Sequence, residues 1–176
     1  MERQKHGFLY EDKYIQENNL IKEDNYTSEY DAYDVDGNCY QIKTIKKGSG
    51  IDLGDIFRNA NKKNNFFLVV AFWQGSKSNI VKVEKLYIDK NIWNEILDFD
   101  KYDELKEWIQ SVSNDYSYDN QWKKERLFWK KEFGNRKINI RFKRDHKSQK
   151  RIQCSINYKV FYSYFVKEFS VLTEKE

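Results

Sequence analysis

The spacing of apolar residues predicts a chain that mixes helices with strands. Residues 66–72 (FFLVVAF) form a continuous apolar run, which is typical of a strand buried on both faces. Residues 80–88 alternate between apolar and polar positions and predict a further strand. Apolar residues recur at helical spacing in other segments, which we expect to be helices: 7–22, 51–62, 91–99, 102–111, 121–133 and 158–169.

A β-hairpin is predicted between the first helix and the second. Residues 27–35 and 39–47 are rich in tyrosine, isoleucine and threonine, and they are joined by Asp36-Gly37-Asn38, a sequence that favours a hairpin turn. Together with the helices and the other strands, this hairpin indicates an α/β (α+β) fold.

The length of the chain, 176 residues, suits one domain with a single core. We expect a core of about residues 7–90, followed by a helical and hairpin region of about residues 91–176. No stretch reaches the roughly 18 consecutive apolar residues that span a bilayer, and the first 22 residues lack the apolar centre of a signal peptide. We therefore expect a cytoplasmic protein without a membrane partner, whose Cys39 and Cys154 are reduced packing residues.

Basic residues are concentrated in a second predicted hairpin, in which residues 137–143 and 151–157 alternate regularly around the loop 144–150. The net charge of +4 would not by itself indicate nucleic acid. However, eight of the sixteen residues 136–151 are Lys or Arg, whereas residues 98–119 contain seven acidic residues and only two lysines. This asymmetry favours a face that binds a polyanion, and a solvated charged surface is the alternative.

Candidate catalytic residues lie on the first hairpin. Gln41 and Lys43 are two apart on a strand and so point to the same face. A three-residue loop with a glycine bulge, formed by residues 36–38, would place Asp31 opposite Lys43 on that face. A two-residue turn would shift the register by one and present Asp34 instead. We favour Asp31 and keep Asp34 as the alternative.

An acid, an amide and a lysine on one face suit the hydrolysis of phosphodiester bonds. Asp31 and the side-chain carbonyl of Gln41 offer hard oxygen ligands for Mg²⁺, which can activate water and neutralise charge on the phosphate. Lys43 would orient or deprotonate the attacking water and stabilise the transition state. The plain structural alternative is a surface lysine beside loop acids, because the pattern D-x₉-Q-x-K is short.

The order of these elements resembles the core of the PD-(D/E)XK nuclease superfamily, in particular its small type II restriction endonucleases. The resemblance covers roughly residues 7–72: a helix, an acidic strand, a hairpin, a strand with Gln-x-Lys, a helix and a buried strand. It implies a restriction-endonuclease-like mixed sheet flanked by helices, with Asp31 as the first acid of the motif, Gln41 as its second ligand and Lys43 as its lysine. Gln41 replaces the usual Asp or Glu, a variation that some restriction enzymes of this superfamily share.

Three further acids are candidates for the same site. An acid from the first helix often joins the metal site in this superfamily, and Glu11 lies on the predicted helix three residues after Phe8. A solvent-facing helix acid is the alternative for Glu11. Asp52 and Asp55 follow the second strand and would either join the site or cap the next helix.

The resemblance implies a Mg²⁺-dependent, sequence-specific enzyme that cuts double-stranded DNA, with a homodimer and a cognate DNA methyltransferase as expected partners. A structure-specific repair or junction nuclease and a non-catalytic nucleic-acid-binding protein are the alternatives. Lys46, Lys47, Arg58 and Asn59 suit phosphate contacts near the cut bond. A two-stranded ribbon fits a major groove. The candidate DNA contacts in the second hairpin are Arg141, Lys143, Arg144, His146, Lys147, Gln149 and Arg151.

Overall fold

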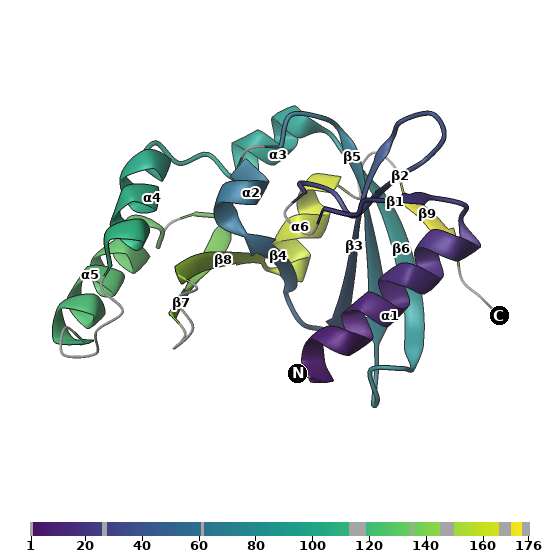
Figure 1. Cartoon of the computed structure of the whole chain (residues 1–176), viewed down its shortest axis with the longest axis horizontal. Helices are drawn as coiled ribbons and strands as arrows, with labels where there is room; N and C mark the ends of the chain where they lie inside the picture. The colour runs from purple at the N-terminus through teal and green to yellow at the C-terminus, as the bar shows by residue number, and fades with distance from the viewer. Residues whose placement is uncertain are drawn as a thin grey trace.

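The computed structural model describes residues 2–25, 28–60, 62–112, 119–134, 136–144, 150–165 and 170–173. Within these ranges the chain is a mixed α/β (α+β) structure with two sheets (Figure 1). The helices are α1 (Glu2–Glu17), α2 (Ile56–Ala60), α3 (Lys90–Ile96), α4 (Tyr102–Ser111), α5 (Asp119–Glu132) and α6 (Tyr158–Phe165). The strands are β1 (Ile21–Lys22), β2 (Ala32–Tyr33), β3 (Cys39–Lys46), β4 (Ile51–Asp55), β5 (Phe66–Trp73), β6 (Ile80–Ile88), β7 (Ile138–Arg144), β8 (Lys150–Ile156) and β9 (Ser170–Thr173).

The larger sheet, sheet A, is mixed and has the strand order β1-β2-β3-β5-β6-β9. Its central strands β3 and β5 are parallel and pair along their whole length, from Cys39↔Phe66 to Lys46↔Trp73, whereas the other neighbours are antiparallel. Parallel neighbours need a long connection, and here it contains β4 and α2. The smaller sheet, sheet B, is antiparallel and has the order β4-β8-β7.

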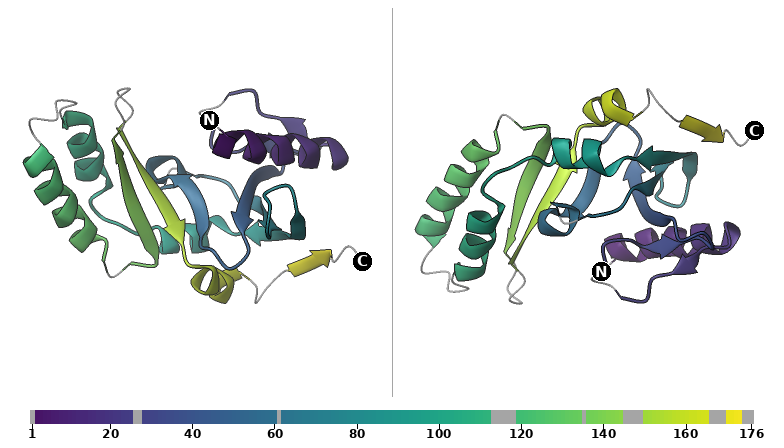
Figure 2. Two further views of the ribbon diagram at one scale, coloured as in Figure 1. Left: turned by 90° about the horizontal axis from the view of Figure 1, so that it is seen from below. Right: turned by 90° about the horizontal axis from the view of Figure 1, so that it is seen from above.

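Apolar side chains pack on both faces of sheet A. Helix α1 covers one face, where Ile15 joins a small cluster with residues of β2, β3 and β5 (Figure 2). The opposite face packs into the main core, to which β3 contributes Cys39 and Ile45. Because side chains alternate along a strand, Gln41 and Lys43 point to this second face, away from α1. The two free cysteines are buried, as expected.

The first helix ends earlier than the pattern 7–22 predicts. Asn19 adopts the left-handed conformation, with φ of 53°. The amide of Leu20 then donates to the carbonyl of Ile15 and that of Asn19 to Gln16, which are the closing bonds of a helix that ends on a left-handed residue. The chain leaves α1 there and continues into the short strand β1, which the sequence did not indicate.

The helix predicted over residues 51–62 is wrong for its first half. Residues Ile51–Asp55 form β4, because they pair with β8 and bury Ile51 against the main core. Only Ile56–Ala60 is helical. The carboxylate of Asp55 accepts hydrogen bonds from the amides of Phe57 and Arg58, so Asp55 caps this helix as expected. Asp52 instead accepts from the amide of Gly54 within the bulge of β4.

The remaining elements agree with the sequence more closely. Helix α4 has the predicted bounds, α3 and α5 begin within two residues of theirs, and the second hairpin is the antiparallel pair β7–β8. The strand expected over 27–35 was too long and is reduced to β2. The last helix is described as far as Phe165, and the rest of its predicted range, 166–169, lies outside the described residues. Strand β9 was not predicted.

Candidate active site

The candidate site lies at the point of β3 where its pairing with the neighbouring strand β2 ends. Strand β2 pairs with β3 only at Cys39 and Tyr40, and the amide of Asp31 adds one bond to the carbonyl of Tyr40 (2.8 Å). Two residues further along β3, the Asp31 carboxylate accepts a hydrogen bond from the amide of Ile42 at 2.6 Å. The side chain of Asp31 therefore replaces a strand partner at the edge of β3.

The turn of this hairpin decides between Asp31 and Asp34. The amides of Gly37 and Asn38 are held at Asp34, and the pairs Ala32↔Tyr40 and Tyr33↔Cys39 leave residues 35–37 as the loop. This is a three-residue loop with a glycine of positive φ, as expected, but it begins one residue earlier than predicted. The register therefore shifts by two residues, which keeps Asp31 on the same face and sets it opposite Gln41, not Lys43.

Asp34 serves the turn and not the site. Its carboxylate accepts hydrogen bonds from the amides of Asp36 and Asn38, from the Asn38 side chain and from the hydroxyl of Tyr40. These bonds, chiefly those from Asn38, lower the pKa of Asp34. Among the two acids considered, Asp31 is therefore the one beside Gln41 and Lys43.

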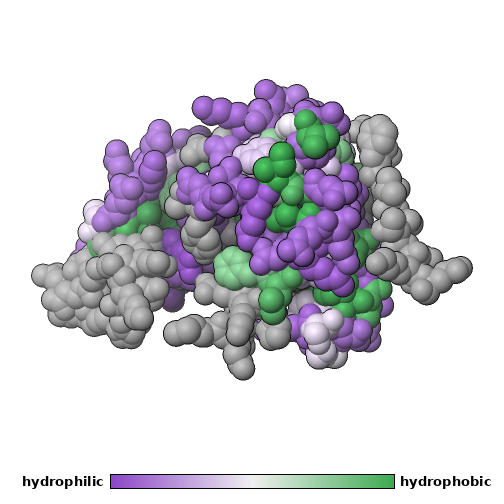
Figure 3. Space-filling model, turned by 45° about the vertical axis from the view of Figure 1, so that its right-hand side comes forward, coloured by the Kyte–Doolittle hydropathy of each residue, from purple (hydrophilic) through white to green (hydrophobic). Residues whose placement is uncertain are grey.

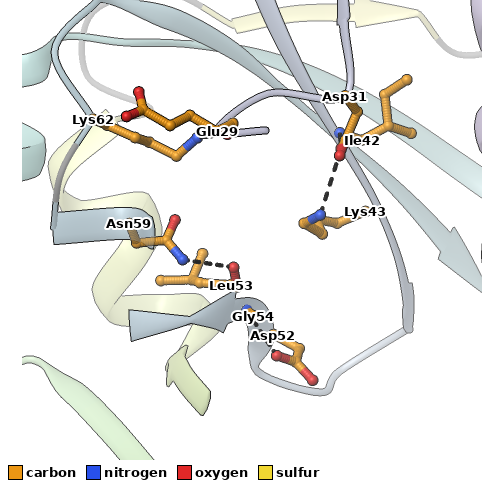
Figure 4. A network of polar contacts seen from close by, with 9 residues as sticks. All are labelled: Glu29, Asp31, Ile42, Lys43, Asp52, Leu53, Gly54, Asn59 and Lys62. Carbon is orange, nitrogen blue, oxygen red and sulfur yellow. Dashed lines mark hydrogen bonds and ion pairs between the residues drawn. The ribbon is translucent and has the colours of Figure 1, made fainter. Parts of the chain in front are cut away.

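Lys43 and Asp31 form an ion pair. Their Nζ and Oδ2 atoms are 3.5 Å apart, and each side chain is 24% exposed. Figure 4 shows Lys43 pointing toward Asp31, with Asp52 and Lys62 on further elements around them. Both groups are partly shielded by protein, yet solvent and a ligand can reach them.

Glu11 approaches the same edge from α1. It precedes Ile15 by one helical turn, and residues four apart share a helix face, so it points to the side on which α1 packs against sheet A. Burial, followed by the negative charge of Asp31, raises the pKa of Glu11 to about 7, while Lys43 acts in the opposite direction. The structure thus brings Glu11, Asp31 and Lys43 within electrostatic reach of one another at the edge of β3.

Gln41 completes the predicted set but is enclosed by protein. Its side chain is only 4% exposed, and its Oε1 atom has no hydrogen-bond partner among the described residues. A carbonyl oxygen and a carboxylate both suit Mg²⁺, and Gln41 shares its face of the hairpin with Asp31, whereas Glu11 lies with α1 at the opposite face of sheet A. In the described part of the chain, no three His, Cys, Asp or Glu residues come together as a metal-binding group. A magnesium site here would therefore depend on the amide of Gln41.

Lys62 is a site residue that the sequence did not reveal. It is 2% exposed, donates a hydrogen bond to the carbonyl of Glu29 and lies over the rings of Tyr30 and Phe66, 4.0 and 4.6 Å from their centroids. Burial, followed by the charge of Lys43, lowers its pKa to about 7, whereas Asp31 acts in the opposite direction. Lys62 thus holds the segment that leads into Asp31.

The four residues that the sequence predicted to contact phosphate next to the site differ in exposure. Lys46 and Lys47 are exposed, and Arg58 is half-buried on α2. The prediction for Asn59 is wrong: this side chain is 1% exposed and donates to the carbonyls of Leu53 and Asp55. Asn59 therefore joins α2 to β4 and has no free donor for a phosphate.

The predicted recognition hairpin presents one polar face. This polar face of sheet B consists of outward-facing residues of its three strands: Asp52, Asn139, Arg141, Lys143, Arg151, Gln153 and Ser155. Arg141 donates to the Oε1 atom of Gln153 (2.8 Å) and lies 4.0 Å from the Asp52 carboxylate. Asn139 and Gln153 were not among the predicted contacts, although the alternation of the strands had placed them on the polar side.

Four predicted contacts lie outside what the structure describes. The backbone of Arg144 ends β7, but its side chain is outside the described residues, as are His146, Lys147 and Gln149. The DNA-binding predictions for these four residues stay predictions.

Asp52 links the polar face of sheet B to β3. It also lines an open cleft of about 240 Å³ together with residues at the end of β3 and in the loops after β3 and β5. Those residues include Thr44, Lys46, Ser49 and Lys77. Polar and basic side chains therefore continue from sheet B to the strand that carries the candidate site.

Comparison with family models, with curated proteins and with solved structures gave no significant match. No described helix has the length and apolar character needed to cross a membrane. The functional interpretation below therefore depends on the geometry of the side chains and on the order of the elements.

Proposed function

We propose that this chain is a Mg²⁺-dependent endonuclease that cuts double-stranded DNA at a specific sequence, as a type II restriction enzyme of the PD-(D/E)XK kind. The observation that carries the proposal is the contact between Asp31 and Lys43 at the open edge of β3, with Glu11 approaching the same edge from α1. Gln41, the remaining member of the expected motif, lies two residues from Lys43 on the same face of β3.

The order of the elements supports the proposal. A helix (α1), a short strand after Asp31 (β2), the strand with Gln-x-Lys (β3), a helix (α2) and a buried strand (β5) follow one another as in the family that the sequence resembles. The strand β4 inserted before α2 was not expected from that resemblance, and it joins sheet B to the core.

The chain's own residues can perform the parts that this hydrolysis needs. Asp31 and the Oε1 atom of Gln41 would hold Mg²⁺, with Glu11 close to Asp31 at the edge of the sheet, and the ion would neutralise phosphate charge and supply hydroxide near neutral pH. The amine of Lys43 would hold the attacking water in line with the phosphorus and balance the charge that develops on the phosphate oxygens. The ion pair with Asp31 keeps this amine at the edge of β3, where a phosphate can approach.

The polar face of sheet B would read the DNA sequence. Arg141 is exposed, and arginine binds guanine in the major groove, whereas the amide of Gln153 suits adenine. Their mutual hydrogen bond fixes both side chains before DNA arrives. Lys46 and Lys77, in the cleft beside Asp52, would contact the phosphates between this face and the site. The same proposal implies a cognate methyltransferase that protects the cell's own sites.

The proposal is tested by incubating the full chain with plasmid and a set of genomic DNAs, with and without Mg²⁺. Discrete Mg²⁺-dependent bands support restriction. Cutting only at branched DNA would replace it with a junction nuclease, and binding without cutting would replace it with a non-catalytic binding protein.

Lys43→Ala is the decisive variant, because it should lower cleavage by about 10³-fold while leaving DNA binding intact. The matched control is Lys13→Ala, a lysine on α1 that pairs with Glu17 on the surface. Cleavage that survives in Lys43→Ala would refute the site. A second readout is Mn²⁺ binding by calorimetry, which Asp31→Asn should weaken and the control should not.

A further inference from the structure

The cleft that Asp52 lines lies at the carboxyl ends of the parallel strands β3 and β5, which are their lower ends in Figure 1. Ligands of open α/β sheets bind in crevices at this end of the strands. The other lining groups come from α1, at Gly7, and from the loops after the two strands. The face shown in Figure 3 is mainly hydrophilic and its apolar residues form separate spots, which does not favour the docking of an apolar partner there.

The cleft is separate from the pair of Asp31 and Lys43. Thr44 and Lys46 alternate with Lys43 along β3, so they point to the face that α1 covers, whereas Lys43 points to the other face. A Cβ atom on Gly7 of α1 would lie 3.8 Å from the Oγ1 atom of Thr44. Because glycine has no side chain, this side of the cleft stays open, and a ligand can enter beside the end of β3.

Two lysines give the cleft its positive charge. Lys46 is exposed and Lys77 is half-buried, and neither forms an ion pair with another described residue. The hydroxyls of Thr44 and Ser49 line the same cleft and can donate hydrogen bonds. Unpaired ammonium groups together with hydroxyl donors suit a phosphate group.

An aromatic ring stands beside these lysines. Trp73 and Lys46 are direct partners in the pairing of β3 with β5, so their side chains are neighbours on the face of α1. The Trp73 side chain is only half-buried, and it has no aromatic contact and no hydrogen bond with another described residue. Asp52 adds a hydrogen-bond acceptor to the cleft, and its charge is partly offset by Arg141, 4.0 Å away. An unengaged indole next to a phosphate-binding group suits a nucleotide, because every base can stack on an aromatic ring.

We propose that the cleft binds one unpaired nucleotide, with its phosphate at Lys46 and Lys77 and its base on the indole of Trp73. A base inside a duplex is stacked on both faces, so the occupant is a free nucleotide or an unpaired nucleotide of a DNA strand. The cleft measures about 240 Å³, below the roughly 300–1,000 Å³ of most ligand pockets, and therefore suits a single nucleotide. The inference deepens the proposed function and rests on it only for DNA as the source.

The test is calorimetric titration of the full chain in EDTA with deoxyadenosine monophosphate and with inorganic phosphate. We expect the nucleotide to bind about fivefold or more tightly than phosphate, because its base stacks on Trp73. Trp73→Leu should remove this difference and keep phosphate binding, which also shows that the variant is folded. Lys77→Ala should weaken both ligands about tenfold, whereas Lys13→Ala, at a surface lysine of α1, should weaken neither. Binding in EDTA needs no cleavage, so a failure here leaves the proposed function standing.

Gly7 allows a test that leaves every charge in place. Gly7→Ala adds a Cβ atom at ordinary contact distance from Thr44 and should bind the nucleotide as the wild type does. Gly7→Leu extends a side chain into the cleft and should weaken both ligands at least as strongly as Lys77→Ala does, although both changes favour the helix. Nucleotide binding that survives in Gly7→Leu overturns the proposal. So does a nucleotide that binds no more tightly than phosphate, or one that fails to bind up to about 10 mM.

Two DNA duplexes identify the source of the nucleotide. One duplex is blunt, and the other carries a single unpaired adenosine at each end. Tighter binding of the second duplex in EDTA, lost in Trp73→Leu, assigns the cleft to an unpaired nucleotide of DNA. Equal binding of the two duplexes assigns it to a free nucleotide.

Discussion

Replacing Lys62 by methionine should remove a specific pH dependence from the stability of this protein. Lys62 is 2% exposed, and its pKa falls from the ordinary 10.5 to about 7 in the folded chain, chiefly through burial. Methionine keeps an unbranched side chain against Tyr30 and Phe66 but carries no proton. It also loses the hydrogen bond to the carbonyl of Glu29, at a cost that does not vary with pH.

The sign and size follow from proton linkage. Below pH 7 both the folded and the unfolded chain hold the proton, and the folded chain bears a penalty of about 5 kcal/mol for the buried charge, from 3.5 pKa units at about 1.4 kcal/mol each. Above pH 7 the folded chain releases the proton while the unfolded chain keeps it up to about 10.5. Wild-type stability should therefore rise by about 1.4 kcal/mol per pH unit, or about 2 kcal/mol between pH 7 and 8.5.

The assay is urea unfolding followed by tryptophan fluorescence at pH 7.0 and 8.5 in the presence of EDTA. The measured quantity is the difference between wild type and Lys62→Met at each pH, because groups common to both chains cancel. Lys63→Met, at an exposed neighbouring lysine, is the control and should follow the wild type. If the wild type and Lys62→Met change equally between the two pH values, Lys62 is not a buried titrating amine and the reasoning fails.

Three other predictions concern the same structure. Between pH 4.5 and 7 the wild type should lose stability, because the pKa of Glu11 is raised to about 7 in the folded chain and the stabilising protonated form disappears as pH rises. Glu11→Gln should remove about 1–2 kcal/mol of this loss, after allowing for solvent. Urea unfolding at pH 5 and 8 measures it, and an equal change of the unfolding free energy in both chains would contradict the prediction. Asn59→Ala should cost about 2–4 kcal/mol, because two carbonyls lose their buried donor; a cost below about 1 kcal/mol in urea unfolding would show that water replaces the amide. Asp89→Ala should cost about 1 kcal/mol in thermal unfolding through the lost cap of α3, while Asp98→Ala, an exposed acid after that helix, should be neutral.

The spacing of apolar residues predicted the helices and strands that bury one face against the core. It missed the elements that form because they pair with strands far away in the sequence. Helix α4 has its predicted bounds because its apolar residues all face the core at helical spacing. Residues 51–55 have the same kind of spacing, but they form β4 because β8, about 100 residues later, offers hydrogen-bond partners. Local preference is weak compared with such pairing, and a single sequence does not disclose the partner.

The part of the candidate site that follows from the alternation of side chains along a strand could be predicted from the sequence. Gln41 and Lys43 share a face in any register, and Asp31 joined them because the loop moved by one residue, which shifts the register by two and preserves the face. Lys62 could not be found in this way. Lys62 and Lys63 are equivalent in the sequence, and only the contacts of Lys62 with Glu29, Tyr30 and Phe66 in the folded chain bury the first, while the second stays exposed.

We expect the carboxylate of Asp31 to limit aggregation as well. In the part of the chain that the structure describes, no strand pairs with the outer edge of β3 beyond Tyr40, and such an edge is a template for strands of other chains. Asp31 occupies the amide of Ile42 and places a negative charge at this edge. Removal of the carboxylate would therefore expose a strand edge that can pair with other chains, and it would also damage the site. An inactive Asp31→Ala protein is informative only if it stays monodisperse, whereas Asp31→Asn retains an acceptor for the Ile42 amide and separates the two effects.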